Sequence, residues 1–372
     1  MIYLDYNAST PVDPAVREAM WPFLGERHGN PTSHHAAGRE VRQAVERARE
    51  QVAGLLGADP DTIIFTSGGT ESNNHVIKGV AESFKDRGRH IITTSIEHPA
   101  VLNPCRFLER QGFEVTYVPV DAQGRVDPES IVHEVRPDTI LISMMHANNE
   151  VGTIQPIAAV AEAARQGGVQ IHTDAAQSCG KVRTNVRELG VDFLSIAGHK
   201  MYAPQGIGAL YIRRGVKMEP LLHGAGHQGG RRAGTEPVAL IVALGAAAEL
   251  ARKTLDGNAV GMRAMRDRLH DGLKKGLGDK AVLLGHPEER LPNTLAIGFR
   301  GCVGGEILSR CPDLCASTGA ACHSGERQRS GVLAAMDVPE EIAFGAVRFS
   351  VGRPTTQAEI DAAIPQLVRA AS

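Results

Sequence analysis

The chain has 372 residues, of which 42% are hydrophobic and 22% charged, and its formal net charge is −2. This near-neutral balance argues against a general affinity for nucleic acid or for an anionic membrane surface. No apolar run approaches the length of a membrane span, and Met1–Asp5 shows no signal peptide, so we expect a cytoplasmic protein. At this length two domains are expected.

From about Asp61 to Arg214, short β-rich runs alternate with helical stretches. The expected strands are Thr62–Thr66, His90–Ser95, Glu114–Val120, Thr139–Met145, Val169–Thr173, Val191–Ile196 and Gly208–Ile212. The expected helices are Glu71–Lys85, Pro99–Arg110, Pro128–Val135 and Ile157–Arg165. This alternation predicts an α/β domain with a mostly parallel sheet and helices on both faces. In such sheets the ligand binds at the carboxyl ends of the strands.

The remainder of the chain predicts a smaller α+β domain. Thr235–Thr254 has the pattern of a long helix that leaves the large domain, and a second helix, Asn258–Leu277, follows a turn-like Asp-Gly pair. Strand-like and helical runs follow from Leu291, and the last helix begins with a capping box from Thr356 to Glu359. We therefore expect a large domain over residues 15–255 and a small domain made of residues 1–14 and 256–372.

Two polar residues follow buried runs near the middle of the chain. Asp174 follows the apolar run Val169–Ile171, and Lys200 follows the run Val191–Ile196. An acid and a lysine at strand ends are what a pyridoxal phosphate (PLP) enzyme needs. The lysine forms a Schiff base with the cofactor aldehyde, and the acid keeps the pyridine nitrogen protonated, so that the ring acts as an electron sink. Most lysines are simply exposed, but one at the end of an apolar run is partly desolvated and therefore more nucleophilic.

Two further motifs lie where an expected strand leads into an expected helix. The turn Ser67–Glu71 offers free backbone N–H groups and the Thr70 hydroxyl to a phosphate. Such a turn alone is weak evidence for a phosphate site, but its presence in one chain with the Asp174–Lys200 pair makes that interpretation stronger. His98 follows the strand His90–Ser95, where an imidazole suits ring stacking and proton transfer near neutral pH. The alternative for His98 is a surface histidine at a helix start.

Three polar side chains are candidates for contacts with a cofactor or a substrate. Asn149, within Asn148–Glu150, and Gln177 carry amides that suit a phenolic oxygen or a carboxylate, although asparagine is also common in turns. Arg348 lies in a strand-like run, and its guanidinium suits a substrate carboxylate, with Arg353 as the second choice. The alternative for these arginines is a surface ion pair.

The six cysteines form no CxxC pair, and a disulfide framework is not expected in a chain of this length without a secretory signal. Cys311 and Cys315 lie four residues apart without a matching second pair, so we expect no metal site. Cys322 differs, because it lies among small and polar residues beside Gly325–Gly331, whose composition indicates a flexible, basic loop. A thiol there is a good nucleophile if neighbouring cations lower its pKa. The alternative is an ordinary loop cysteine.

In their order along the chain, these motifs resemble the class I cysteine desulfurases of the NifS/IscS type. Those proteins are class-V aminotransferase enzymes of PLP fold type I, which is aspartate aminotransferase-like. The likeness runs nearly end to end and rests on LDYNAST, GNPTS, FTSGGTESNN, EH, ANNEVG, HTDAAQS, GHK, GGRRAGTEP, RLPNT, GAACHSG and RFSVGR. It implies conversion of L-cysteine to L-alanine, with the sulfur passing to Cys322 as a persulfide and on to an acceptor. The chain is also similar to the selenocysteine lyases, so release of selenium and L-alanine from L-selenocysteine is the alternative.

The resemblance also implies a role for each site residue. Lys200 binds the cofactor and acts as the base, Cys322 takes the sulfur, and His98 stacks on the ring and moves a proton. The cofactor contacts are expected from Gly69, Thr70, His98, Asn149, Asp174, Gln177, Ser195, His199, Lys200 and Thr235. The substrate carboxylate is expected to contact Asn30, Asn149 and Arg348. Thr235 is expected to reach the phosphate of the neighbouring subunit, so the active unit is expected to be a homodimer.

One position departs from the family pattern. The family usually has a serine three residues before the lysine, where it donates to the phosphate, and this chain has Ala197 there. Ser195 lies two residues earlier, and on a strand such a pair faces the same side. Two interpretations stay open: Ser195 replaces the missing hydroxyl, or the phosphate has one hydroxyl contact fewer.

Two different functional classes also stay open. An aminotransferase or a β-lyase of the same fold type needs no loop cysteine. A protein that keeps the fold only as a scaffold would lack the cofactor's absorption band. The sequence does not identify the sulfur acceptor, whether a scaffold protein or a thiol carrier. Nor does it identify the pathway among iron–sulfur cluster biogenesis, tRNA thiolation, DNA sulfur modification and selenium recycling.

Overall fold

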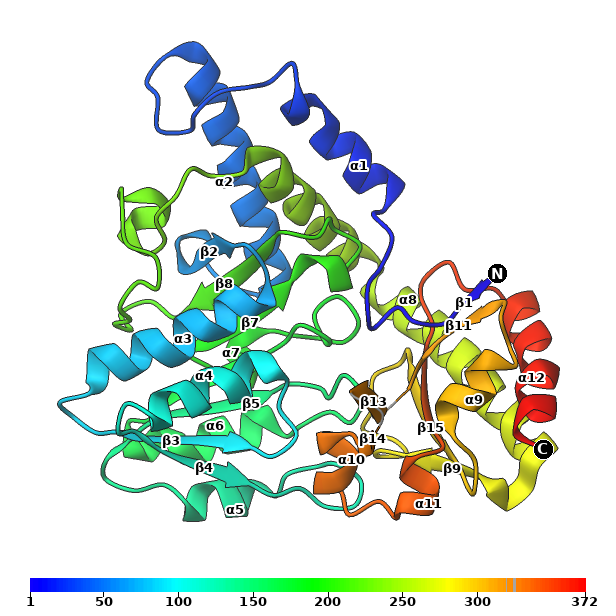
Figure 1. Cartoon of the computed structure of the whole chain (residues 1–372). Coiled ribbons are helices and arrows are strands. Elements are labelled where there is room, and N and C mark those ends of the chain that lie inside the picture. Colours follow the sequence, from blue (N-terminus) through cyan, green and yellow to red (C-terminus); the bar gives the residue numbers. More distant parts are fainter. Residues whose placement is uncertain (319, 324–325) are drawn as a thin grey trace.

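The computed structural model describes residues 1–318, 320–323 and 326–372, and for residues 166, 320–323 and 326–328 it describes the backbone only. Its larger part is built on a seven-stranded sheet with the order β2-β8-β7-β6-β5-β3-β4 (Figure 1). The strands are β2 (Ile63–Thr66), β3 (His90–Thr94), β4 (Glu114–Val118), β5 (Thr139–Met145), β6 (Gln170–Asp174), β7 (Phe193–Ala197) and β8 (Gly208–Ile212). Strands β4, β3, β5, β6 and β7 run parallel, whereas β8 is antiparallel to both of its neighbours. The predicted mostly parallel α/β sheet is confirmed.

Helices cover both faces of this sheet, because its strands carry buried apolar side chains on both sides. The helices of this part are α1 (Pro14–Met20), which packs against the long helix α8 (Val238–Leu277), and α2 (Ala36–Leu56), α3 (Gly69–Phe84), α4 (Pro99–Glu109), α5 (Pro128–His133), α6 (Ile157–Ala164) and α7 (Val186–Leu189). In β2, Ile63 and Phe65 pack into the core under α2 and α6, whereas Ile64 packs into a second core under α3 and α4. Helices α1, α2 and α7 have no counterpart among the expected helices.

The smaller part has a four-stranded antiparallel sheet with the order β12-β15-β10-β9. Its strands are β9 (Ala281–Leu284), β10 (Thr294–Phe299), β12 (Ser317–Thr318) and β15 (Ala346–Ser350), and its helices are α9 (Gly304–Ser309), α10 (Gly331–Ala335), α11 (Glu340–Ala343) and α12 (Gln357–Ala371). Leu295, Phe299 and Phe349 form the centre of a separate core. The predicted capping box is confirmed, because Thr356 Oγ1 accepts from the Glu359 N–H while the Glu359 carboxylate accepts from the Thr356 N–H.

One continuous helix, α8 (Val238–Leu277), joins the two parts. The prediction of two helices separated by Asp256-Gly257 is therefore wrong. A glycine inside a helix costs only about 1 kcal/mol relative to alanine, and α8 packs against α2 in one part and α12 in the other. Because α8 contributes Leu244 to one core and Leu269 to the other, the expected boundary at residue 255 falls inside it. The division into residues 15–255 and residues 1–14 with 256–372 stays a prediction.

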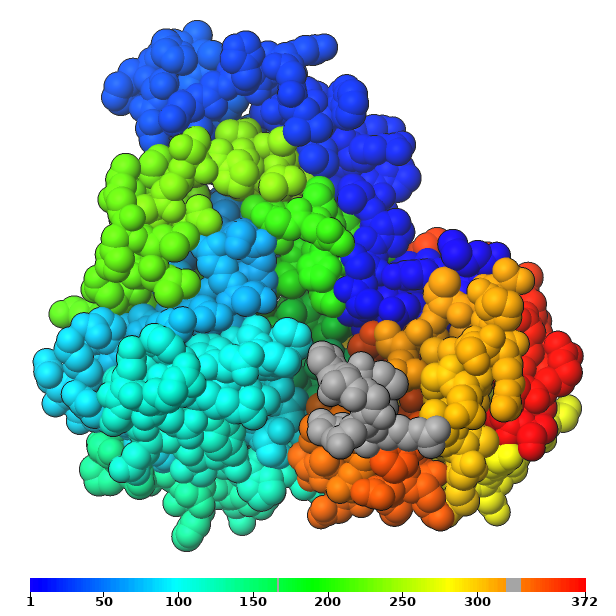
Figure 2. Space-filling model, in the orientation of Figure 1, coloured from blue at the N-terminus to red at the C-terminus, as the bar shows by residue number. Residues whose placement is uncertain are grey.

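The N-terminal segment connects the two parts (Figures 1 and 2). Strand β1 (Ile2–Tyr3) pairs in parallel with β11 (Leu314–Cys315) of the smaller part. Further on, the N–H of Thr10 donates to the carbonyl of His199 at 3.0 Å, so the segment lies against the turn that follows β7. Residues between these two anchors therefore lie beside the carboxyl end of the large sheet.

Strands β13 (Ala320–His323) and β14 (Glu326–Arg329) form a two-stranded antiparallel sheet in which Cys322 pairs with Arg327. The composition of Gly325–Gly331 indicates a loop, but most of this stretch is strand β14 and the start of α10. Backbone pairing of two short strands requires no apolar side chains, so composition does not reveal it. Residue 325 and the side chain of Cys322 lie outside the described part of the chain.

Candidate active site

A cavity of about 410 Å³ opens at the carboxyl ends of β5, β6 and β7, where the two parts and the N-terminal segment meet. It is lined by Asn7, Ala8, Gly69, Thr70, Asn73, His98, Ala100, Met145, Ala147, Asn149, Asp174, Ala176, Gln177, Ala197, His199, Lys200 and Arg348. This is the edge at which open parallel sheets bind ligands. Most of the side chains proposed from the sequence therefore share one cavity.

Lys200 lies in a short 3₁₀ turn directly after β7. Its Nζ donates to the backbone oxygens of Asn7 and Ala8, the second at 2.7 Å. Burial, with a smaller contribution from Arg348, lowers the pKa of the Lys200 ammonium to about 8, although two nearby carboxylates act in the opposite direction. An amine with a pKa this close to neutral pH is available as a nucleophile and as a base.

Asp174 is the last residue of β6, and its side chain is held by two donors. Its Oδ2 accepts from Asn73 Nδ2 at 2.6 Å, and its Oδ1 accepts from the N–H of Ala176 at 2.9 Å. The orientation of the carboxylate in the cavity is therefore fixed. Asn73 was missed by the sequence analysis, although it lies three residues after Thr70 on α3 and therefore on the same face of that helix.

His98 caps the N-terminus of α4, where its Nδ1 accepts from the N–H of Ala100 at 3.0 Å. The neutral ring therefore carries its proton on Nε2. Desolvation lowers the pKa of the His98 imidazole, Lys200 acts in the same direction, and Asp174 opposes them. A neutral imidazole in the cavity suits both stacking on an aromatic ring and proton transfer.

One end of the cavity has the character of an anion site. Helix α3 begins at Gly69, and the N–H groups of a first helical turn have no partners within the helix. Thr70 contributes a hydroxyl at the same place. His199 Nδ1 is buried without a hydrogen-bond partner among the described residues. Free N–H groups at a helix start beside a hydroxyl and an imidazole suit a phosphate.

Ser195 does not reach this end of the cavity. It is fully buried, and its Oγ pairs with His172 Nε2 at 2.9 Å, while His172 Nδ1 pairs with Ser143 Oγ at 2.8 Å. Ala197 lines the cavity and Ser195 does not. Residues two apart on a strand are separated by about 7 Å along it. Ser195 and Ala197 therefore share a face of β7, but Ser195 lies too far from the cavity to contact a ligand there. The geometry therefore contradicts Ser195 as a substitute for the missing serine.

At the opposite end, Arg348 projects from β15 into the cavity. Its Nη1 donates to the Asn149 carbonyl at 2.9 Å, and its Nη2 pairs with Asp5 at 2.7 Å and with Ser317 Oγ at 3.0 Å. Its Nε is buried with no partner among the described residues, so one donor is available for another anion. Asn148, by contrast, is fully buried and holds the backbone of its own turn, so Asn149 is the asparagine of this motif that lines the cavity.

Three residues considered from the sequence lie outside the cavity of their own chain. Asn30 is exposed, and its Oδ1 accepts from the Thr32 N–H at 3.0 Å. Thr235 is exposed in the segment that precedes α8. Arg353 lies over the Tyr202 ring, with 3.8 Å from Cζ to the centroid, and also forms an ion pair. Its guanidinium is therefore not available to a ligand in the cavity.

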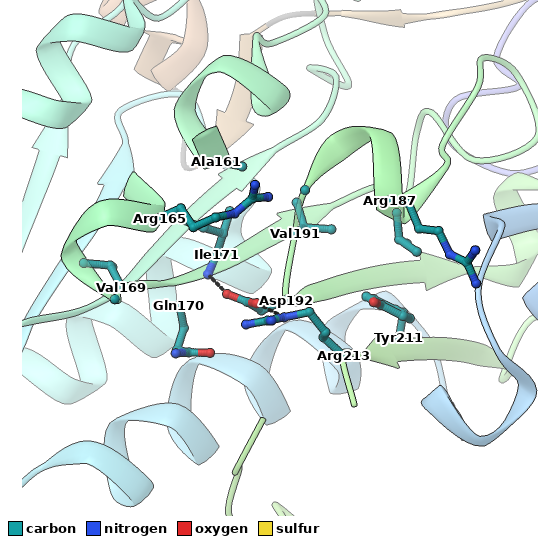
Figure 3. A pocket seen from close by; sticks show the side chains of 13 residues that line it. Ala161, Arg165, Val169, Gln170, Ile171, Arg187, Val191, Asp192, Tyr211 and Arg213 are labelled. Atoms are coloured by element: carbon teal, nitrogen blue, oxygen red, sulfur yellow. Dashed lines mark hydrogen bonds and ion pairs between the residues drawn. The ribbon is translucent and has the colours of Figure 1, made fainter. Parts of the chain in front are cut away.

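A second cavity, of about 280 Å³, lies beside the start of β6 and the end of β8, at the opposite edge of the sheet (Figure 3). Arg165, Arg187 and Arg213 line it together with Asp192, and Arg187 lies apart from that carboxylate. Asp192 pairs with Arg213 at 2.5 Å and accepts from a backbone N–H of β6 at 2.8 Å, and Arg187 pairs with Asp59 at 3.4 Å. This cavity offers paired charges and contains neither a lysine nor a histidine.

Residues 2–363 match the aminotransferase class-V family. The chain belongs to this family. It is 48% identical over 370 residues to "Cysteine desulfurase IscS" of Dictyoglomus turgidum, covering 99% of this chain and 94% of that protein. Among solved structures, a NifS-like protein has 40% identity and a TM-score of 0.93, covering 99% of this chain and 98% of that one. The structure "SspA in complex with cysteine" has 35% identity and a TM-score of 0.83, covering 96% of this chain and 100% of that one. PLP fold type I and the resemblance to cysteine desulfurases are confirmed.

In this member of the aminotransferase class-V family, the cavity fits PLP. The start of α3 and the unpartnered His199 Nδ1 suit the phosphate, and Lys200 offers an amine to the aldehyde. Asp174 offers an oriented carboxylate to the pyridine nitrogen, and His98 offers a ring to its face. Each polar group of the cofactor thus has a chemically matched partner, and PLP is the cofactor of this protein.

Asn7 is another residue of the cavity that the sequence analysis missed. Its backbone oxygen accepts from Lys200 Nζ and, at 3.0 Å, from Gln177 Nε2. Its Nδ2 donates to Thr294 Oγ1 at 2.8 Å, which ties the N-terminal segment to β10 of the smaller part. These partners are far apart in sequence, so local patterns do not connect them.

Proposed function

We propose that this protein is a PLP-dependent cysteine desulfurase that converts L-cysteine to L-alanine. Its sulfur is transferred to Cys322 as a persulfide and then to an acceptor. The observation that carries the proposal is the cavity in which Lys200 and the oriented Asp174 carboxylate lie together. The Dictyoglomus turgidum relative named above is a cysteine desulfurase, so selenocysteine lyase activity is the less favoured alternative.

Bound PLP supplies a carbonyl for the substrate amine and a ring that stores electrons. Lys200 removes the α-proton of the substrate, because its lowered pKa leaves much of the amine neutral near pH 8. Asp174 keeps the pyridine nitrogen protonated, and Gln177 Nε2 donates to the phenolic oxygen. Gly69, Thr70 and His199 hold the phosphate.

The other end of the cavity orients the substrate. Arg348 and Asn149 hold its carboxylate, with the unpartnered Arg348 Nε as the available donor. His98 faces the cofactor ring and transfers a proton. The substrate is thereby held across the cavity between β15 and the carboxyl ends of β6 and β7.

The Cys322 thiolate attacks the sulfur of the bound substrate. A sulfur–sulfur bond forms as the carbon–sulfur bond breaks, and the electron pair stays on the carbon side until protonation gives L-alanine. The enzyme keeps the outer sulfur as a persulfide. A thiol of the acceptor then attacks that outer sulfur and releases the Cys322 thiolate. No external oxidant or reductant enters these steps.

Cys322→Ala tests this proposal. Alanine formation from L-cysteine is expected to fall by at least about 10²-fold, because the sulfur loses its acceptor. Incubation of the wild type with substrate is expected to add one sulfur atom to the peptide that contains Cys322, measured by mass spectrometry. Cys315→Ala, in nearby strand β11, is the matched control and is expected to keep activity.

Full activity of Cys322→Ala on L-cysteine would contradict the persulfide mechanism. The same two proteins assayed with L-selenocysteine test the alternative. If the protein is a selenocysteine lyase, it should turn over selenocysteine faster than cysteine. That turnover should depend little on Cys322, because selenium is the better leaving group.

The active unit is proposed to be a homodimer in which Thr235 contacts the phosphate in the partner's cavity. Thr235 is exposed and lies outside the cavity of its own chain, and so does Asn30. Trp21 and Leu24 are 69% and 60% exposed, which is unusual for two large apolar side chains in one short 3₁₀ helix. An interface between subunits would cover them.

Subunit mixing tests the dimer. In a dimer of Lys200→Ala and Thr235→Ala chains, one cavity carries both changes and the other carries neither. One site of the mixed dimer is therefore expected to bind PLP with wild-type affinity, whereas the Thr235→Ala homodimer binds it more weakly. Weak binding at every site of the mixed dimer would contradict a contact across the interface.

The acceptor is proposed to be a scaffold protein or thiol carrier in the cytoplasm, with iron–sulfur cluster biogenesis as the pathway. No helix in the described ranges has the length and apolar character to cross a membrane. The net charge of −2 offers no basis for direct binding to nucleic acid. Capture of acceptor proteins on the persulfide form of the enzyme, with Cys322→Ala as control, would identify the partner.

A further inference from the structure

Lys181 lies behind the cavity, and none of the roles proposed above uses it. It is only 5% exposed, and its Nζ donates to Asn7 Oδ1 and to Gln177 Oε1, each at 3.0 Å. No carboxylate in the described part of the chain forms an ion pair with it. Burial lowers the pKa of the Lys181 ammonium well below its usual value, and Lys200 and Arg348 act in the same direction. A buried amine without an anion is unfavourable, so its position calls for an explanation.

The two acceptors of Lys181 are both amide oxygens. The amide of glutamine is nearly symmetric in shape, and only its hydrogen-bond partners decide which end faces which way. The Lys181 Nζ donates in both of these hydrogen bonds, so it pairs with the oxygen end of the amide. Lys181 therefore turns Oε1 of Gln177 inward and leaves Nε2 facing the opposite direction.

The Nε2 group selected in this way shares a hydrogen-bond acceptor with Lys200. Gln177 Nε2 donates at 3.0 Å to the backbone oxygen of Asn7, the same atom that accepts from Lys200 Nζ. Gln177 and Lys200 both line the cavity, whereas Lys181 does not. Lys181 is therefore one hydrogen bond removed from the ligand.

We propose that Lys181 is a positioning residue that fixes the Gln177 amide so that Nε2, and not Oε1, is presented to the phenolic oxygen of PLP. This inference rests on the contact proposed above between Gln177 and that oxygen. A turned amide would place Oε1 against an electron-rich oxygen, which would repel it. A purely structural role for Lys181, as a link between Asn7 and the large sheet, predicts a loss of stability without any effect on the cofactor.

The test is a double-mutant cycle of Lys181→Met and Gln177→Leu in the PLP-loaded enzyme. The quantity to measure is the pH midpoint at which the cofactor's visible absorption band titrates. Loss of the Gln177 Nε2 donor makes the phenolic oxygen of the cofactor more basic. The proton whose loss changes the cofactor's absorption band is therefore retained to higher pH. Each single variant is expected to raise the midpoint, by about one pH unit for Gln177→Leu. The double variant is expected to match Gln177→Leu. Lys253→Met, at an exposed position on α8, is the control and is expected to leave the midpoint unchanged.

The outcomes separate this inference from the role of Gln177. If Gln177→Leu raises the midpoint and Lys181→Met does not, the inference about Lys181 is wrong and the Gln177 contact stands. If Gln177→Leu has no effect, the Gln177 contact fails and the inference fails with it. Additive shifts in the double variant would show that Lys181 acts independently of Gln177, which also overturns it. If Lys181→Met does not fold, Lys181→Gln replaces it. The glutamine side chain offers both a donor and an acceptor, so it fixes the orientation of the Gln177 amide less strictly than lysine does. It is then expected to give a smaller upward shift, and no shift contradicts the inference.

Discussion

Two cavities in this protein gather cations around a buried aspartate, and they differ in solvent exposure and in pairing. In the PLP cavity, Arg348 has a side chain only 13% exposed and pairs with Asp5. Asp174 forms no ion pair within the described part of the chain and is oriented by the neutral amide of Asn73. In the second cavity, Arg213 has a side chain 57% exposed, and it pairs directly with Asp192. An ion pair neutralises both partners, whereas a neutral partner orients a charge and leaves it available.

The difference extends to the reactive amine. Lys200 is partly buried, which lowers its pKa to about 8, and its partners are backbone oxygens that leave its charge unpaired. An exposed arginine undergoes no comparable change. A cluster of charged side chains thus becomes a reactive site only where the side chains are buried and some of them lack an ion-pair partner. Substitutions at matched positions of the two cavities test that rule.

The largest effect is expected for Lys200→Ala, compared with Arg213→Ala. The first removes both the amine that binds PLP and the base, so the turnover of L-cysteine should fall by about 10⁴-fold or more. The second should leave turnover within about twofold. Alanine release measures both, and substantial turnover by Lys200→Ala would refute its role.

A second matched pair is Asp174→Asn and Asp192→Asn. The first replaces a carboxylate that holds the ring proton by a neutral amide, so kcat should fall by about 10²–10³-fold. The second should keep kcat and lower the free energy of unfolding by about 1–3 kcal/mol, because an ion pair is broken beside a buried group. Steady-state kinetics and denaturant unfolding measure the two effects. Similar losses of kcat in the two variants would remove the distinction between the cavities.

The lowered pKa of Lys200 predicts the pH dependence of PLP capture by the apo-protein. Only the neutral amine reacts, so the capture rate should rise with pH up to about 8 and level off above it, well below the usual lysine value of 10.5. Arg348→Gln removes a charge that lowers this pKa, so the midpoint should move upward. Stopped-flow absorbance measures the rate. A midpoint that stays in place in the variant would mean that burial alone sets the pKa.

The smallest effect concerns the position that departs from the family pattern. Ala197→Ser adds a hydroxyl at the phosphate end of the cavity and should tighten PLP binding about fivefold, the equivalent of one hydrogen bond. Ser195→Ala should leave PLP binding unchanged and destabilise the protein by about 1 kcal/mol, since it breaks the bond to His172. Equilibrium binding and thermal unfolding measure these effects. Weaker PLP binding by Ser195→Ala would instead restore Ser195 as a phosphate ligand.

The successes and failures of prediction from the sequence have distinct physical reasons. Asp174 and Lys200 were located because apolar runs end where strands end, and this signal is local. Ser195 was misjudged because strand periodicity gives the face of a residue but not its depth in the sheet. The break at Gly257 was misjudged because its small cost is offset by the packing of α8 against α2 and α12.

By itself, the sequence determined the alternation of strands and helices, the motifs at the strand ends and, through them, the cofactor and the family. The tertiary structure decided which polar groups are free. It placed Lys181 against Asn7, 174 residues away in sequence. It also paired the Ser195 hydroxyl with His172 and lowered the pKa of Lys200. Desolvation and long-range hydrogen bonds set these properties, and both depend on which distant segments pack together rather than on the local order of residues.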